Sequence, residues 1–129
     1  MTRTVYVNGE YLPENEAKIS IFDRGFLMAD GVYEVTSVLE GKLIDFDGHA
    51  VRFQLSLDSL DMHTPISTAA LFDVHFELVR VNELVAGMLY LPITLRSPAD
   101  RDFVFPAPVT TPQPLVLFTP PIPCLAYSP

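Results

Sequence analysis

The chain has 129 residues, of which 49% are hydrophobic, and it carries a formal net charge of −8 at pH 7. This length and hydrophobic content suffice for one ordinary domain with its own core and leave no room for a second. Only eight lysines and arginines stand against sixteen acidic residues. That balance argues against a nucleic-acid-binding surface, because phosphate backbones are bound by clustered positive charge.

The cysteine content and the amino terminus bear on location. A single cysteine, Cys124, offers no internal disulfide and no metal cluster, which fits a reducing compartment. The first four residues lack the apolar core of a signal peptide, and no apolar run reaches the roughly 18 residues of a membrane span. We therefore expect a cytoplasmic protein without nucleic-acid or membrane partners and without a metal.

A β-hairpin is predicted at the amino terminus. The alternating run Thr4–Val7 is followed by Asn8-Gly9 and then by Glu10–Leu12. Asn-Gly suits the two positive-φ positions of a type I′ turn, so the two short runs are expected to pair antiparallel.

A polar loop then leads into a second hairpin. Residues 20–31 carry the turn signals Asp23-Arg24-Gly25 and Asp30-Gly31, and the run from Val32 to Leu39 is typical of a strand. We expect this strand to pair with Lys42–Phe46. Its period of two places one set of side chains on one face and the alternate set on the other. The two sets are Tyr33, Val35 and Ser37, and Val32, Glu34 and Thr36.

Two helices are predicted next. Asp47 is the expected N-cap of a helix from about Gly48 to Asp61. Its apolar stripe is formed either by Val51, Leu55 and Leu60 or by Phe53, Leu57 and Leu60. A second helix is expected from Ser67 or Thr68 to about Asn82, with a stripe of Leu71, Val74, Leu78 and Val81.

The last third contains two further strands. Residues 88–95 are typical of a strand, although Pro92 indicates an edge, a bulge or an irregularity within it. Residues 114–119 are expected to form a short strand. The order predicts an α+β fold in which a mostly antiparallel sheet packs with two helices. Residues 1–119 would form the domain, and 120–129, with four prolines, an extended or disordered tail.

Few side chains suggest chemistry by pattern alone. His49 and Arg52 lie three apart on one helix face, where Arg52 offers a planar fork to a phosphate or a carboxylate. The alternative is that both are solvated helix residues. Tyr33 on its strand is either a packing residue or a site residue, and the loop residues Arg96 and Arg101 either grip an anion or face solvent.

No catalytic residue is assigned from these patterns. His63 and His75 have no metal-type spacing with each other or with Cys124. Lys18 and Lys42 are the only lysines. One lies in a polar connector and the other beside a hairpin turn, so neither is expected in an apolar pocket.

Several motifs in register nevertheless resemble a known family. They are Tyr6-Val-Asn-Gly-Glu-Tyr-Leu12, Asp23-Arg-Gly-Phe26, Asp30-Gly-Val-Tyr-Glu34 and Gly48-His-Ala-Val-Arg52. From about residue 5 to 119 the chain resembles the amino-terminal domain of the fold-type IV, or class IV, pyridoxal-phosphate-dependent aminotransferases. Within that class it is most similar to the D-amino-acid (D-alanine) transaminases.

The resemblance implies roles for five residues. Arg52 corresponds to the arginine that grips the phosphate of the cofactor, pyridoxal phosphate. Tyr33 and Val35 correspond to strand residues that face the substrate, and we expect them to border the same space as Arg52. His49 corresponds to a histidine near the substrate-carboxylate pocket. Arg101 corresponds to a loop arginine that holds the substrate carboxylate across a dimer interface.

The resemblance also implies what the chain lacks. In the family the Schiff-base lysine lies in a second domain, so we expect a truncated relative that does not move an amino group between an amino acid and a 2-oxo acid alone. Whether it binds pyridoxal phosphate stays open. Ala29 stands where the family usually has a glycine.

Two other functions are alternatives to that of an aminotransferase-like domain. They are a module that associates with itself or a related chain, and a phosphate-ligand-binding module. Within the family, the alternatives are aminodeoxychorismate lyase and branched-chain aminotransferase.

Overall fold

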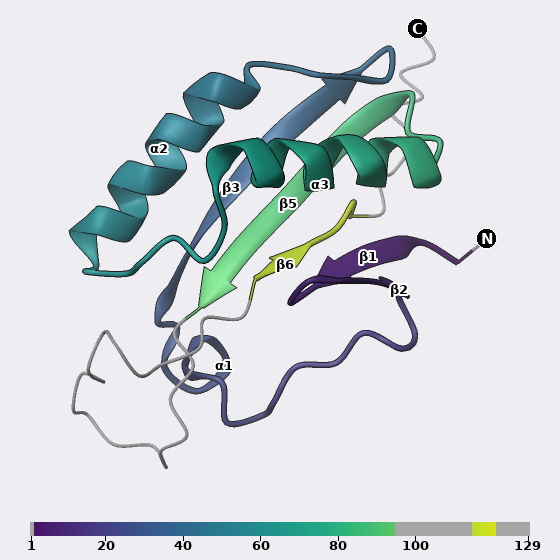
Figure 1. The fold of residues 1–129 in the computed structure, drawn as a ribbon. Helices are drawn as coiled ribbons and strands as arrows, with labels where there is room; N and C mark the ends of the chain where they lie inside the picture. The colour runs from purple at the N-terminus through teal and green to yellow at the C-terminus, as the bar shows by residue number, and fades with distance from the viewer. Residues whose placement is uncertain (1, 95–114, 121–129) are drawn as a thin grey trace, which may run out of the picture.

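The computed structural model describes residues 2–94 and 115–120. Two three-stranded antiparallel sheets have the orders β2-β1-β6 and β4-β3-β5. The strands are β1 Thr4–Val7, β2 Glu10–Pro13, β3 Gly31–Leu39, β4 Lys42–Leu43, β5 Ala86–Thr94 and β6 Val116–Leu117. The helices are α1 Arg24–Met28, α2 Phe46–Ser59 and α3 Thr68–Val81. The predicted α+β class is confirmed, and Figure 1 shows β6, the edge strand of the first sheet, between β1 and β5.

Both predicted hairpins are present. Asn8 and Gly9 have φ angles of 51° and 99° and place Val7 opposite Glu10, which is the geometry expected of an Asn-Gly turn. The second hairpin is shorter than predicted. Only Val38 and Leu39 pair with β4, because the chain leaves the strand after Leu43 and already forms α2 at Phe46.

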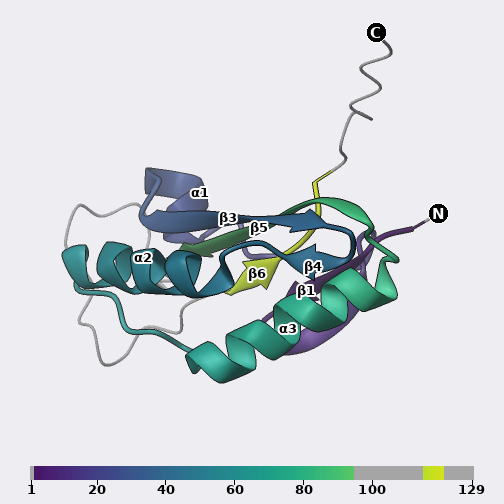
Figure 2. The same ribbon diagram turned by 90° about the horizontal axis from the view of Figure 1, so that it is seen from above.

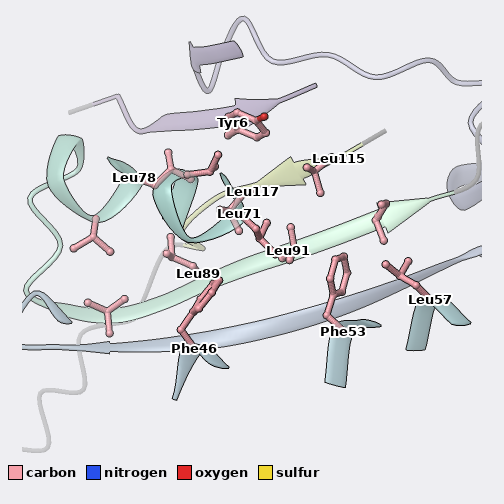
Figure 3. Packing of buried hydrophobic residues seen from close by; sticks show 14 of the residues in the cluster. Tyr6, Phe46, Phe53, Leu57, Leu71, Leu78, Leu89, Leu91, Leu115 and Leu117 are labelled. Carbon is pink, nitrogen blue, oxygen red and sulfur yellow. The ribbon is translucent and has the colours of Figure 1, made fainter. Parts of the chain in front are cut away.

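Helices α2 and α3 cover one face of the sheets, as Figure 2 shows from above. Between them and the strands lies the hydrophobic core, part of which is drawn in Figure 3. Helix α2 contributes Phe46, Phe53 and Leu57 to this core, so the second of its two possible stripes is the buried one. Val51 and Leu55 are exposed. The core comprises Tyr6, Val38, Phe46, Phe53, Leu57, Met62, Leu71, Val74, Leu78, Val79, Leu89, Leu91, Ile93, Leu115 and Leu117.

Two local predictions are wrong. The N-cap of α2 is Asp45, whose carboxylate accepts from the Gly48 amide, and Asp47 lies in the first turn instead. Residues 24–28, expected to be loop, form the short helix α1. Its N-cap is Asp23, which accepts from the Gly25 amide, and the cap supplies a partner for one of the free amides of the first turn.

Pro92 produces the irregularity expected of it. Tyr90 and Phe118 exchange two backbone hydrogen bonds, so the Tyr90 amide faces β6. Two residues further on, the nitrogen of Pro92 faces β6 as well and has no proton to donate. Among the described residues, the pairing of β5 with the segment around β6 consists of isolated bridges, Tyr90 with Phe118 and Ile93 with Leu115.

Among residues 2–94 and 115–120, no helix combines the length and the apolar character that a membrane crossing needs.

Candidate functional site

Strand β3 separates two environments. Glu34, Thr36 and Val38 are buried on the face covered by the helices. Tyr33 lies on the opposite, outer face and is 58% exposed. The alternation follows the period of two predicted for this strand.

The buried face of β3 holds a cluster of three charged or polar side chains. Glu34 is only 3% exposed, and one of its carboxylate oxygens, Oε2, lies 2.9 Å from His49 Nδ1. The other oxygen, Oε1, lies 2.9 Å from Arg52 Nε. A buried carboxylate is costly unless it is paired, so these two residues of α2 explain how a glutamate is tolerated there.

The contact between Arg52 and Glu34 is a charge contact without the alignment of a hydrogen bond. Within the described residues Oε1 accepts no hydrogen bond, although Arg52 Nε is close to it. The Arg52 side chain itself is 73% exposed. Its inner nitrogen therefore touches a buried anion while the outer end of the guanidinium faces solvent. That end has the fork geometry that suits a phosphate or a carboxylate.

The outer face of the sheet is aromatic and apolar. Tyr33 packs against Tyr90 with ring centroids 5.4 Å apart, and Tyr90 against Phe118 at 5.3 Å. Beside Phe118 lies a hollow of about 290 Å³. It is lined by Val7, Ala17, Lys18, Ile19, Pro92, Thr94, Val116 and Phe118.

The surroundings of Lys18 correct one expectation from the sequence. Lys18 borders this apolar hollow and is not confined to polar surroundings, although the residue remains exposed to solvent. Lys42, in β4, is also exposed.

The loop that leads into β3 is held by close packing. Asp23 and Arg24 are buried, and Arg24 Nε donates to Asp30 Oδ2 at 2.6 Å. A Cβ on Gly25 would stand 2.1 Å from the Thr94 side chain, and one on Gly31 would stand 2.7 Å from the Ile93 carbonyl oxygen. Glycine is therefore required at both positions, and this packing fixes the start of β3 against the end of β5.

The five candidate residues fall into three groups. The structure brings His49 and Arg52 together through Glu34. It places Tyr33 and Val35 on the other face of β3, so these two do not border the same space as the Glu34 cluster. Arg101 lies outside the described residues, as does Arg96.

Sequence reasoning missed Glu34 as part of the site. The signal was available, because the period of two puts Glu34 on the core side with Thr36 and Val38, where a lone carboxylate needs a partner. In the part of the chain that the structure describes, no three histidine, cysteine or acidic residues are grouped as metal ligands would be.

Comparison with known proteins places these features in a family context. No protein-family model matches the chain. It is 37% identical over 108 residues to a D-alanine aminotransferase of Staphylococcus haemolyticus, covering 84% of this chain and 38% of that protein. It is 34% identical over 115 residues to a D-alanine aminotransferase of Staphylococcus aureus strain MSSA476, covering 89% of this chain and 40% of that protein. The chain is homologous to the class IV aminotransferases.

Solved structures of class IV aminotransferases and their relatives share the fold of this chain. The branched-chain aminotransferase of Escherichia coli superimposes with a TM-score of 0.83 at 15% identity, over 95% of this chain and 40% of that one. A branched-chain aminotransferase of T.th., solved with pyridoxamine 5′-phosphate, gives 0.80 at 20% identity, over 92% and 39%. The 4-amino-4-deoxychorismate lyase of Pseudomonas aeruginosa gives 0.69 at 26% identity, over 91% and 39%.

The extent of these matches is consistent across both comparisons. The chain spans about 40% of the length of the curated relatives and solved structures it matches. Its architecture is that of the small domain of class IV aminotransferases.

Proposed function

We propose that this chain supplies the phosphate-anchoring side of a class IV, pyridoxal-phosphate-dependent aminotransferase site of the D-amino-acid type. The parent reaction moves an amino group between an amino acid and a 2-oxo acid. The single observation that carries the proposal is Arg52, whose inner nitrogen is held by a buried carboxylate while its outer end is exposed. A guanidinium with one edge fixed and the other free fits a phosphate group.

The bound cofactor supplies the electron sink of amino-group transfer, and the residues described here would hold its phosphate. His49 would stand near the substrate carboxylate, and Arg101 would bind that carboxylate. Tyr33 and Val35 lie on the face of β3 opposite Glu34, His49 and Arg52, so the substrate-facing role that the resemblance implies for them is not part of this proposal. The relatives named D-alanine aminotransferase, at 34–37% identity, favour this branch. The branched-chain enzymes match through the fold, at 15% and 20% identity.

The chain of 129 residues is proposed to bind without catalysing. A transaminase needs a lysine at the cofactor, and the two lysines of this chain are poorly placed for that role. Lys18 borders the hollow on the outer face of the sheet, whereas Arg52 contacts Glu34 on the helix-covered face. Lys42 is exposed beside the β3–β4 turn. A protein of this composition, with one cysteine, is proposed to be cytoplasmic.

Phosphate anchoring is tested with pyridoxamine 5′-phosphate, which has no aldehyde to react with lysines, and with phosphate-free pyridoxamine. An NMR titration should give a dissociation constant on the order of 1 mM for the phosphate form, as for a single charged anchor. Pyridoxamine should bind much more weakly. Arg52→Gln should abolish the difference between the two ligands, and Arg80→Gln, which removes the same charge from α3, should retain it.

Equal binding of both ligands, or an Arg52→Gln variant that binds like the wild type, would contradict the anchoring role. The catalytic half of the proposal has its own measurement. Incubation with D-alanine, 2-oxoglutarate and pyridoxal phosphate should yield no pyruvate above the protein-free control. Pyruvate formation would show that the chain catalyses alone.

A second candidate function is association, because large apolar side chains are exposed. Phe26 is 70% exposed, and Ile19, Ile21, Phe22 and Tyr33 are also largely open to solvent. Exposed apolar side chains in this number are typical of an interaction surface. We propose that the chain pairs with itself or with a related chain. Sedimentation velocity should show a concentration-dependent dimer, which Phe26→Ser weakens, and a monomer at all concentrations would contradict self-association.

A further inference from the structure

Glu34 touches both candidate ligand-binding side chains of α2. Its Oε2 lies 2.9 Å from His49 Nδ1 and its Oε1 lies 2.9 Å from Arg52 Nε. The contacts join β3 to the first two turns of α2, one through each oxygen of the Glu34 carboxylate. Because Glu34 is almost wholly buried, its position is fixed by the sheet and does not follow the movement of the exposed arginine.

The contact with Glu34 determines which nitrogens of the Arg52 guanidinium remain available to bind a ligand. Nε lies against Glu34, and within the described residues Nη1 and Nη2 have no hydrogen-bonding partner. A long side chain that is 73% exposed would otherwise sample many rotamers. Holding Nε therefore orients the outer edge of the guanidinium before any ligand arrives, which lowers the entropic cost of binding.

We propose that Glu34 is a positioning residue, which fixes the guanidinium of Arg52 for a phosphate-bearing ligand and holds His49 beside it. The proposal rests on the phosphate-anchoring role proposed above. The proposal predicts the direction in which phosphate affinity changes when the carboxylate is removed. A carboxylate close to an anion site repels the anion. If charge alone mattered, removing the carboxylate would tighten phosphate binding. If positioning dominates, removing it weakens binding.

Two variants separate these effects. Glu34→Gln removes the charge and keeps the shape, and Glu34→Asp keeps the charge and shortens the reach by one methylene. Both should weaken pyridoxamine 5′-phosphate binding, by about threefold to tenfold, the range expected when one long side chain must be ordered by the ligand instead of in advance. The control is Glu77→Gln, which breaks a carboxylate–arginine pair of the same kind with Arg80 and should leave the affinity unchanged.

A second readout needs no ligand. The ¹⁵Nε–Hε order parameter of Arg52 should be high in the wild type and should fall in both Glu34 variants, whereas Glu77→Gln should lower only that of Arg80. Thermal melting of each variant establishes that it is folded. Glu34→Asp carries the test if Glu34→Gln does not fold, because it retains the charge that pairs with His49 and Arg52.

The outcomes distinguish the two proposals. If the wild type binds no phosphate ligand but Arg52 is ordered and loosened by the Glu34 variants, the anchoring function fails and the positioning of Arg52 stands. If binding depends on Arg52 but Glu34→Gln leaves it unchanged or tightens it, the positioning proposal is overturned. An Arg52 side chain equally mobile in the wild type and in both Glu34 variants would overturn it as well.

Discussion

Asp23 and Thr94 lie 71 positions apart in the chain and are joined by a hydrogen bond of 2.9 Å from Thr94 Oγ1 to Asp23 Oδ2. The other oxygen of Asp23 accepts from the Gly25 amide at 2.8 Å and caps α1. Asp23 is 1% exposed, so no solvent replaces either partner. One carboxylate thus fixes the loop before β3 to the end of β5.

Thr94→Val should destabilise the protein by about 1–3 kcal/mol, because it leaves a buried carboxylate oxygen without its donor while keeping the shape of the side chain. The free energy of unfolding is measured by urea denaturation. Thr68→Val, at the exposed start of α3, is the matched control and should stay within about 0.5 kcal/mol of the wild type. Equal stabilities for the two variants would show that the Asp23–Thr94 bond contributes nothing.

Ala29 is held in the left-handed region, with a φ of 58°, where it ends α1. The family resemblance places a glycine here, and glycine adopts this conformation without the cost of a Cβ. Ala29→Gly should therefore stabilise the protein by about 0.5–1 kcal/mol, after allowance for the greater freedom of glycine in the unfolded chain. Differential scanning calorimetry should show a higher melting temperature.

Ala86→Gly is the control for this substitution. Ala86 is exposed at the start of β5 and is not among the positive-φ residues, so the same change brings only the entropic cost there and should lower the melting temperature. A loss of stability in Ala29→Gly as large as in Ala86→Gly would mean that the left-handed conformation is not the controlling factor.

The sequence predicted those elements in which the period of the apolar side chains matches the face that is buried in the structure. The stripe of α3 and the two faces of β3 follow from side-chain period alone, and the structure has both. The side-chain period did not determine the first residue of α2, because two aspartates could serve as its N-cap. Asp45 and Asp47 are both acceptable caps locally. The structure has Asp45 as the cap, which leaves Phe46 in the first turn of the helix, where it packs against Phe72 and His75.

Helix α1 and the Glu34 cluster show a second limit of sequence reasoning. A five-residue helix that contains a glycine has little intrinsic stability, and α1 exists because Asp23 caps it and Gly25 fits closely against Thr94. The face of Glu34 was predictable from the period of β3. Its partners were not, because they come from an adjacent helix whose rotation about its axis the sequence left open between two stripes.

His75 should make stability depend on pH. Burial in the core lowers its pKa from 6.5 to about 4, partly offset by a hydrogen bond to the Leu71 carbonyl. Between those values the unfolded chain binds a proton that the folded chain does not, so the free energy of unfolding falls as the pH falls from 6.5 towards 4. The full loss amounts to about 3 kcal/mol for a shift of this size.

Urea denaturation at several pH values between 5 and 6.5 measures this slope, above the range in which carboxylates titrate. His75→Gln should remove most of the slope, whatever it does to the stability at pH 7. His63→Gln, at an exposed position, should leave the slope intact. A wild type whose stability is constant across this range would contradict the low pKa of His75.

Pro92 interrupts the ladder between β5 and β6, and restoring a donor there should tighten their junction. The two bridges pair Tyr90 with Phe118 and Ile93 with Leu115, so the antiparallel count places Pro92 opposite Val116. Pro92→Val adds an amide that can donate across this gap, a gain of about 0.5–1.5 kcal/mol. The greater freedom of the unfolded chain offsets about 0.4–1 kcal/mol of it, so global stability should change little.

Amide hydrogen exchange is the sharper measurement, because it reports on β5 and β6 locally. In Pro92→Val the amides of Tyr90 and Phe118, which already bond across this junction, should exchange about threefold to tenfold more slowly, as expected for one added hydrogen bond. Pro13→Val at the exposed end of β2 is the control, and it should leave both rates unchanged. Faster exchange at Tyr90 and Phe118 in Pro92→Val would mean that the missing donor is not what separates the two strands, and that the fixed φ of proline holds β5 in the shape that β6 requires.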